Sequence, residues 1–140
     1  MINLPDINVW IALAWDGHIF HSAAEAWFNG IDSGGASFCR VTQMGFLRLL
    51  TQPKVMGVEV LDNAKAWGAF HAFAADPRVT FSGEAISPEA DWVQFTKGRS
   101  TKIWTDAYLA AFAIAHNLHV VSFDSEFNTF PKLSKTVLSI

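Results

Sequence analysis

Short apolar runs alternate along the chain with stretches in which apolar residues recur at helical spacing. The apolar run Met1–Leu4 ends before Pro5 and predicts a first strand. Further strands are predicted over residues 36–39, 79–81, 119–123 and 136–140. Helices are predicted over residues 6–16, 23–28, 43–50, 62–75, 88–96 and 106–115. Because strands that alternate with helices form a parallel sheet covered on both faces, we expect a three-layer α/β/α fold with a central, mostly parallel sheet.

Several helix ends are marked by residues with strong terminal preferences. Thr42 is a favourable N-cap for the third helix, and Ser87 followed by Pro88 is favourable for a later one. Asn117 suits a helix C-cap. The nine residues Ala107–Ala115 carry no charge. A helix without a polar face is buried on all sides, so we expect this one in the core.

The composition is that of one folded domain. The chain has 140 residues, of which 51% are hydrophobic and 16% charged, which excludes disorder and predicts a single domain over residues 1–140. Cys39 is the only cysteine, which excludes an intramolecular disulfide and a cysteine-based metal cluster. The N-terminus has no signal segment, and no apolar run approaches the ~20 residues of a membrane span. We therefore expect a cytoplasmic protein without a membrane partner.

Three aspartates are candidates for one site at the edge of the sheet. Asp6 follows the first strand, Asp124 follows the strand of residues 119–123, and Asp106 opens the buried helix that leads into that strand. Ligands of open α/β sheets bind at the carboxyl ends of the strands. Carboxylates that meet there repel one another, and a hard cation such as Mg²⁺ or Mn²⁺ relieves the repulsion. Aspartate is also a favoured N-cap, so capping alone stays an alternative for each of them.

The segments around these aspartates resemble the three signature segments of PIN domains. They are Leu-Pro-Asp-Ile-Asn-Val-Trp at residues 4–10, Thr-Asp-Ala-Tyr-Leu-Ala-Ala at residues 105–111 and Val-Ser-Phe-Asp-Ser-Glu-Phe at residues 121–127. The similarity is strongest to the VapC-type toxins of bacterial toxin–antitoxin pairs and extends over nearly the whole chain. The middle segment is specific, whereas the other two alone are weak signals.

This resemblance implies a PIN-like fold and a magnesium-dependent endoribonuclease that hydrolyses RNA phosphodiesters at an acidic site, with Mg²⁺ or Mn²⁺ as cofactor. Asp6, Asp106 and Asp124 match the family's catalytic and metal-binding acids. Asn8 and Thr105 match polar positions beside them. The resemblance also implies a homodimer and a cognate antitoxin whose C-terminal segment covers the active site.

The chain departs from the family pattern at the start of the third helix. The family's remaining acid follows a threonine there, whereas this sequence has Thr42 followed by Gln43. Gln43 offers a carbonyl oxygen to a metal or its waters but no negative charge, so we expect both residues to line the site without direct ligation by Gln43. Glu126, two residues after Asp124, is interpreted as an ordinary exposed acid. A weakened PIN-fold module that binds RNA or a protein is therefore the alternative function.

A phosphoryl-transfer protein, such as a receiver domain or a phosphatase, is a third interpretation. Such proteins also place aspartates at strand ends and use Mg²⁺. They require a second acid beside the first-strand aspartate, and Asn8 stands at that position. This interpretation therefore ranks below the other two.

The net charge of the chain is compatible with RNA binding if the three aspartates are metal ligands. The formal net charge is −3, with 13 acidic and 10 basic residues, which excludes only a broadly basic nucleic-acid binder. With the three aspartates set aside as metal ligands, acidic and basic residues are equal in number. The candidates for RNA contact are Arg40, Arg48, Arg99, Lys102, Trp10, Trp15 and Trp104. Trp104 is the preferred aromatic, whereas Trp27, Trp67 and Phe70 are expected in the core.

Overall fold

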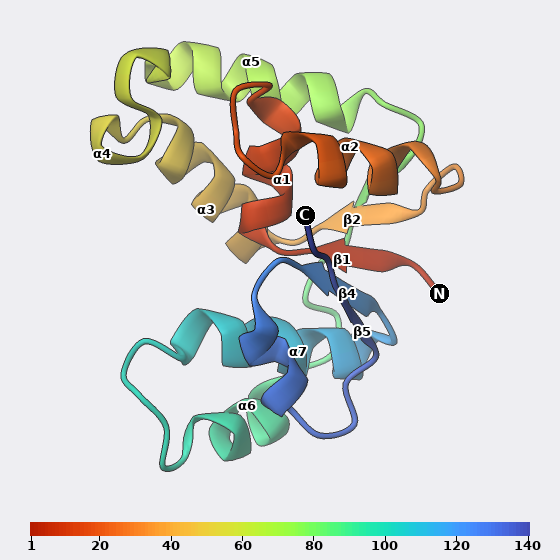
Figure 1. Ribbon diagram of the computed structural model, residues 1–140. Helices are drawn as coiled ribbons and strands as arrows, with labels where there is room; N and C mark the ends of the chain where they lie inside the picture. The colour runs from red at the N-terminus through yellow and green to blue at the C-terminus, as the bar shows by residue number, and fades with distance from the viewer.

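The computed structural model describes residues 1–140 as three layers, with a sheet between two groups of helices (Figure 1). All five strands are parallel and lie in the order β3-β2-β1-β4-β5. They are β1 (Asn3–Pro5), β2 (Ala36–Phe38), β3 (Val79–Phe81), β4 (His119–Ser122) and β5 (Lys135–Val137). The predicted α/β class and three-layer architecture are confirmed.

Helices cover both faces of the sheet, with the larger group on one face (Figure 1). The larger group is α1 (Ile7–Ala14), α2 (His21–Asn29), α3 (Arg40–Leu50) and α5 (Asn63–Ala74), with the short α4 (Pro53–Met56) and the 3₁₀ helix η1 (Gly57–Glu59) at its edge. The smaller group is α6 (Glu89–Thr96) and α7 (Trp104–His116), with the 3₁₀ helix η2 (Ser125–Thr129). None of these helices is long and apolar enough to span a lipid bilayer.

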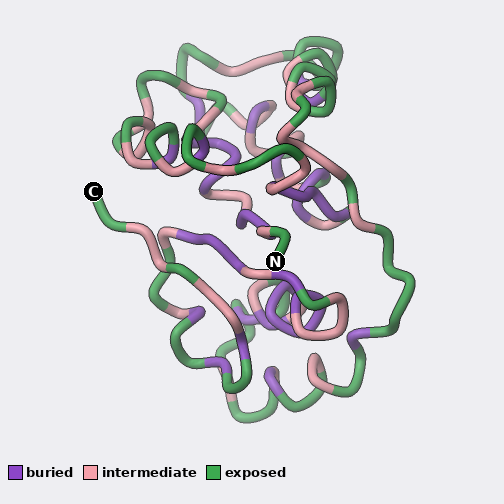
Figure 2. Tube along the Cα trace, turned by 90° about the vertical axis from the view of Figure 1, so that its right-hand side faces the viewer, coloured by how far each residue is buried: buried purple, intermediate pink, exposed green.

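An aromatic core fills the space between the sheet and the larger group of helices. The Trp10 ring of α1 stacks on the Phe38 ring of β2, with 3.8 Å between their centres. Phe46 of α3 and Phe70 of α5 also contact Phe38. All four side chains are buried, and the buried stretches run through the middle of the molecule (Figure 2). These contacts hold α1, and therefore the end of β1, in a fixed position.

The other face of the sheet is covered mainly by α7. Its uncharged residues Ala107 and Leu109–Ala113 are buried in one hydrophobic cluster with Leu4 of β1 and Val120 of β4. The helix ends at Asn117, which has a left-handed backbone with φ of 54° and ψ of 50°. Burial of this helix and the C-cap at Asn117 are confirmed.

The six predicted helices begin one to three residues away from their predicted starts. The N-cap at Thr42 is wrong, because α3 begins at Arg40 and Cys39 is its N-cap. Thr42 Oγ1 accepts a hydrogen bond from the Cys39 N–H at 3.0 Å, so it closes the first turn from inside the helix. In the same way α7 begins at Trp104 instead of residue 106, and α6 begins at residue 89 with Pro88 as its N-cap.

Short elements account for most of the other differences. The predicted last strand over residues 136–140 is wrong at its C-terminal end, because β5 ends at Val137. The helices α4, η1 and η2 were not predicted, because three to five residues are too few to show a hydrophobic period.

Two tryptophans lie where the sequence analysis did not place them. Trp10, a candidate for RNA contact, is fully buried, and its Nε1 has no hydrogen-bond partner. Trp67, expected in the core, is 45% exposed. Ala66 and Phe70 face the core from α5, and the residue after Ala66 is turned by about 100° around the helix. Phe70 is buried as expected.

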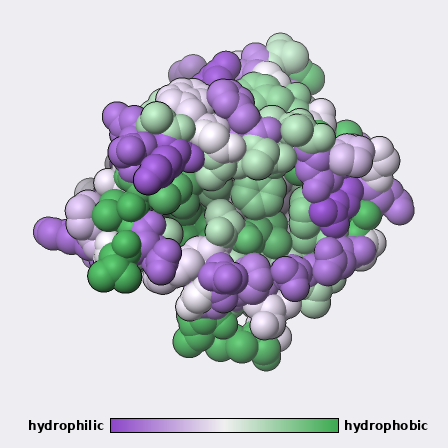
Figure 3. Space-filling view, turned by 90° about the horizontal axis from the view of Figure 1, so that it is seen from above, coloured by the Kyte–Doolittle hydropathy of each residue, from purple (hydrophilic) through white to green (hydrophobic).

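An apolar groove lies between α2 and α5 on the outer face of the larger helical group. It has a volume of about 450 Å³ and is lined by Leu13, Ala14, Phe28, Ala69, Ala72 and Phe73. Glu25, Asn29, Asp76 and Arg78 complete its lining. Seen from this side, an apolar area is bordered by polar side chains (Figure 3).

Replacement of Phe38 by alanine is expected to lower the free energy of unfolding by about 3–5 kcal/mol, because the central ring of the aromatic core is lost. Phe81 provides a matched control, since it pairs with Phe38 in register on β3 but is 42% exposed. Phe81→Ala should cost about 1 kcal/mol or less. Urea unfolding measures both values. Equal destabilisation by the two variants would contradict the central role of Phe38.

Candidate active site

Asp6 lies at the carboxyl end of β1, next to the end of β4. Pro5 and Val121 are paired in register, and the Asp6 N–H donates to the Val121 carbonyl at 2.8 Å. Asp6 Oδ1 accepts a hydrogen bond from the Ile7 N–H at 2.7 Å and so caps α1. The residue is only 6% exposed. Its second carboxylate oxygen therefore needs a partner inside the protein.

That partner is Ser122, the last residue of β4. Ser122 Oγ donates to Asp6 Oδ2 at 2.8 Å and accepts a hydrogen bond from the Asp124 N–H at 2.9 Å. One buried hydroxyl thus joins the ends of two neighbouring strands. Our sequence analysis missed Ser122. The available signal was a polar residue at the end of an apolar strand, two positions before an aspartate.

Asn8 extends this network from the first turn of α1. Its Nδ2 donates to Ser122 Oγ at 3.2 Å, and its Oδ1 accepts a hydrogen bond from the Phe123 N–H at 3.3 Å. The amide therefore holds the segment that leads to Asp124 against α1. The structure places Asn8 beside Asp6 and Asp124, and its side chain orders the backbone between them.

Asp106 reaches the same edge from the first turn of α7, in the other helical layer. Burial is the main cause that raises its pKa to about 7, and the charges of Asp6, Asp124 and Glu126 raise it further. Burial also raises the pKa of Asp6, against the lowering effect of its hydrogen bonds from Ser122 and Ile7. The carboxylates therefore lie close enough to repel one another.

Asp124 and Glu126 form the exposed side of this acidic group. Asp124 Oδ1 accepts a hydrogen bond from the Glu126 N–H at 2.9 Å and caps η2. Glu126 is held by Arg99, whose Nη2 lies 2.8 Å from Oε1 and also donates to Thr129 Oγ1 at 2.7 Å. The Arg99 guanidinium lies over the Phe130 ring, 5.0 Å from its centre. Arg99, a predicted RNA contact, is therefore already engaged within the protein.

Gln43 enters the site region from α3 and is 7% exposed. Its Oε1 accepts a hydrogen bond from Arg40 Nη1 at 2.5 Å, so the oxygen expected to face a metal or its waters is bound to a guanidinium. The Arg40 guanidinium also lies 4.9 Å from the centre of the Phe81 ring. Thr42 is fully buried and supports the first turn of α3.

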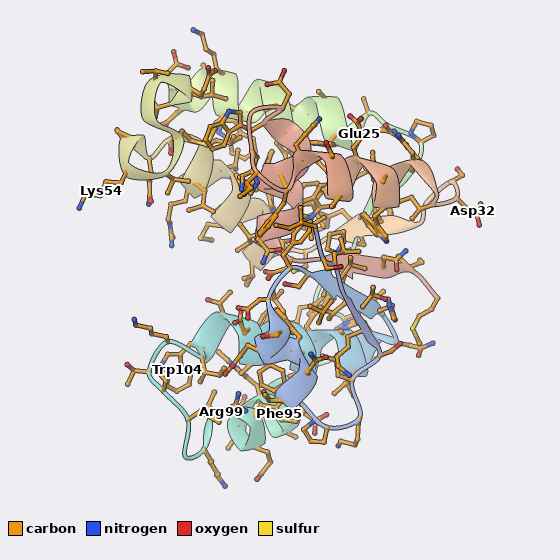
Figure 4. All side chains as sticks on the ribbon, in the orientation of Figure 1. Glu25, Asp32, Lys54, Phe95, Arg99 and Trp104 are labelled. Atoms are coloured by element: carbon orange, nitrogen blue, oxygen red, sulfur yellow. The ribbon has the colours of Figure 1, made fainter.

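Three further predicted residues lie at the exposed N-terminal end of α7. Trp104 is 56% exposed and Thr105 and Lys102 are exposed as well. Trp104 lies on the outer side of the smaller helical group (Figure 4). Thr105 directly precedes Asp106, so these side chains lie next to the acidic group but are not part of it.

The acidic group fits a hard divalent cation by its chemistry and its charge. Carboxylate oxygens are ligands that Mg²⁺ and Mn²⁺ prefer. A cation would offset both the burial and the repulsion that raise the pKa of Asp106. No group of three or more His, Cys, Asp or Glu side chains is gathered closely enough to enclose a metal ion. The carboxylates therefore share one edge of the sheet without forming a closed cage.

The fold is a parallel α/β domain with carboxylates at one edge of its sheet, and comparison with known families narrows this class. Residues 4–133 match the model of the PIN domain. Ribonuclease VapC41 of Mycobacterium tuberculosis is 40% identical over 143 residues, which cover 97% of this chain and 98% of that protein. Ribonuclease VapC38 of the same organism is 32% identical over 124 residues, which cover 87% and 84%. The chain therefore belongs to the PIN-domain family, among the VapC proteins, as its signature segments predict.

Solved structures show the same fold. VapBC2 of Rickettsia felis, bound to a promoter DNA fragment, has a TM-score of 0.70 at 12% identity and covers 99% of this chain and 100% of that chain. VapC20 of Mycobacterium tuberculosis, described as a sarcin–ricin loop cleaving toxin, has a TM-score of 0.67 at 16% identity, with 93% and 97% covered. FitAcB of Neisseria gonorrhoeae has a TM-score of 0.64 at 20% identity, with 96% of both chains covered.

Asp106→Asn is expected to stabilise the protein when no metal is bound. The pKa of Asp106 is about 7 in the folded protein, above its ordinary value of 3.8. At a pH between these two values, the folded chain therefore keeps a proton that the unfolded chain has released. Stability is therefore lost as the pH rises from about 4 through 7. The amide avoids this loss. At about pH 8 we expect a gain of about 1–3 kcal/mol, less than the full pKa shift implies, because the carboxyl is only partly buried.

Urea unfolding in a chelator, at about pH 4 and about pH 8, measures this gain. Asp32→Asn is the control, because Asp32 is exposed and lies far from the acidic edge (Figure 4). The control should change stability equally at both pH values. A gain for Asp106→Asn that does not grow with pH would show that the carboxyl is not strained by burial and its neighbours.

Proposed function

We propose that this protein is a metal-dependent endoribonuclease that acts in the cytoplasm as the toxin of a type II toxin–antitoxin pair. Asp6, Asp106 and Asp124 are its metal-binding and catalytic acids. The observation that carries the proposal is the meeting of these carboxylates at one sheet edge, where burial, together with their repulsion, raises the pKa of Asp106 to about 7. The names of the relatives support the substrate, since VapC41 and VapC38 are ribonucleases.

The chain's own residues supply orientation and charge for this chemistry. When bound, Mg²⁺ or Mn²⁺ polarises a phosphoryl oxygen, lowers the pKa of a coordinated water and offsets the developing negative charge. Ser122 and Asn8 fix Asp6 and the segment before Asp124, so these carboxylates are oriented before substrate arrives. Without a cation, the Asp106 carboxyl holds a proton near neutral pH in part of the molecules. Release of this proton gives the site its full negative charge.

The basic side chains near the site differ in their freedom to bind RNA. Arg40 is paired with the neutral amide of Gln43, so its positive charge is not balanced by that partner. Lys102 is exposed beside α7. Both suit contacts with the phosphate backbone, whereas Arg99 is bound to Glu126. We therefore assign contacts with the RNA to Arg40 and Lys102.

The protein partner in this proposal is a cognate antitoxin. The neighbours described as VapBC2, VapBC and FitAcB support such a partner. We expect the C-terminal segment of the antitoxin to cover the acidic edge of a homodimeric toxin. A segment with a basic side chain fits there, because none of the three aspartates forms an ion pair within the protein.

Purified protein is expected to cleave structured RNA in Mg²⁺ or Mn²⁺ and to lose this activity in excess chelator. Asp6→Asn should lower the rate at least about 100-fold, because a buried, oriented charge is removed from the site. Asp32→Asn is the control with the same chemical change and should keep full activity. Gel analysis of end-labelled RNA measures all three. Undiminished cleavage in chelator, or by Asp6→Asn, would refute the proposed mechanism.

Gln43→Glu is expected to raise cleavage about 10-fold at limiting Mg²⁺, because a fourth carboxylate strengthens cation binding. The new carboxylate lies beside Arg40, which favours its charged form. Gln94→Glu, at an exposed position on α6, makes the same change in net charge and should have no effect. A Mg²⁺ titration of the cleavage rate measures the difference. If the parent chain has almost no activity and Gln43→Glu gains it, the alternative of a weakened binding module is favoured. If the Mg²⁺ titration is the same for both, Gln43 is not part of the site.

A further inference from the structure

A cleft of about 420 Å³ adjoins the acidic edge, between the start of α3 and the helices α6 and α7. Its lining consists of Arg40, Val41, Glu84, Trp92, Trp104, Thr105 and Tyr108. Thr105 connects the cleft to the acidic group, because Asp106 is the next residue. Arg40 connects it from the opposite element, through the hydrogen bond to Gln43. The volume lies within the ~300–1,000 Å³ typical of sites for small organic groups.

Aromatic rings form the apolar walls of this cleft. The Trp92 ring stands at 79° to the Tyr108 ring and at 84° to the Trp104 ring, with centres 5.2 Å and 6.1 Å apart. Trp92 Nε1 donates to the Trp104 carbonyl at 3.0 Å, which fixes this arrangement. Trp104 remains 56% exposed beside these contacts, which leaves a large part of its ring surface open. A planar group can stack on that surface.

Two charged side chains supply the cleft with a hydrogen-bond acceptor and hydrogen-bond donors. Glu84 Oε2 accepts a hydrogen bond from Tyr108 Oη at 2.7 Å, and Glu84 Oε1 has no partner. Arg40 has one N–H bonded to Gln43 Oε1, which leaves further donors of its guanidinium free. The cleft thus presents an acceptor and a donor beside a stacking surface.

Among the nucleobases, guanine matches this pattern. Its N1–H and N2–H groups are adjacent donors that a carboxylate accepts, and its O6 is an acceptor that arginine contacts. Adenine, cytosine and uracil do not present two adjacent N–H donors. The open carboxylate of Glu84 therefore distinguishes guanine from the other three bases.

We propose that this cleft is a subsite for an unpaired guanine of the RNA substrate. The base stacks on Trp104, its N1–H and N2–H donate to Glu84, and Arg40 donates to O6. The proposal rests on the proposed function in that it takes RNA as the substrate. It adds a specificity for one base next to the bond that is cut.

Binding of labelled pentaribonucleotides tests the subsite without cleavage. The probes are UUGUU, UUAUU, UUCUU and UUUUU, and the protein is the full chain with Asp6→Asn, so the RNA stays intact. Fluorescence anisotropy should show at least about 10-fold tighter binding of UUGUU than of UUUUU. Equal binding of all four probes would overturn the proposal.

Substitutions in the cleft assign this preference to its residues. Glu84→Gln should reduce the preference for UUGUU over UUUUU to about twofold or less, since the paired acceptor is lost. Trp104→Ala should weaken binding of UUGUU about 10-fold, and Trp104→Phe should restore most of it. The controls are Trp67→Ala, at a similarly exposed tryptophan on α5, and Glu59→Gln on η1. If the cleft variants bind like these controls, the subsite is refuted.

Cleavage assays with the parent chain separate this proposal from the proposed function. Cleavage in Mg²⁺ with a base preference that Glu84→Gln and Trp104→Ala leave unchanged would refute the subsite and keep the nuclease. Absence of cleavage, together with a guanine preference that depends on Glu84 and Trp104, would refute the nuclease and keep the subsite.

Discussion

The parallel pairing of β1 with β4 is the constraint on which the site depends. It brings the carboxyl ends of two strands side by side, and the Ser122 hydroxyl joins Asp6 to the backbone of Asp124. Since Asp6 is only 6% exposed, this bond also satisfies a carboxylate oxygen of a buried residue. The helix α1 then starts on Asp6, so the same carboxylate orients the aromatic core and the acidic edge.

Burial and charge act against each other at this edge. The packing that orders Asp6 and Asp106 also raises their pKa values, because water is removed and the negative charges face one another. The fold therefore holds its carboxylates in an arrangement that is unfavourable without a cation. Gln43 lessens this cost, since a neutral amide stands at the family's fourth acidic position and bonds to Arg40. The same substitution removes a charge that would help to bind the cation.

The sequence predicted the features that show in long apolar stretches and in the signature segments. The uncharged run from Ala107 predicted the buried helix, and the spacing of Asp6, Asp106 and Asp124 predicted their common edge. It did not predict Ser122, because one hydroxyl in an apolar strand is no signal until the strand order is known. Trp10 and Trp67 were misplaced for a related reason. Which side of a helix is buried depends on the element that packs against it, and the local sequence around Trp10 and Trp67 does not show that element.

The two helical layers meet the sheet in separate hydrophobic clusters, one around α7 and one around α1, α3 and α5. Asp6 and Asp124 belong to strand ends, whereas Asp106 belongs to α7. A cation held by all three would therefore act as a cross-link between the sheet and the smaller helical layer. Its binding energy would add to the stability of the first turn of α7. The same turn carries Trp104, so loading of the acidic edge and ordering of the aromatic cleft would be one coupled equilibrium.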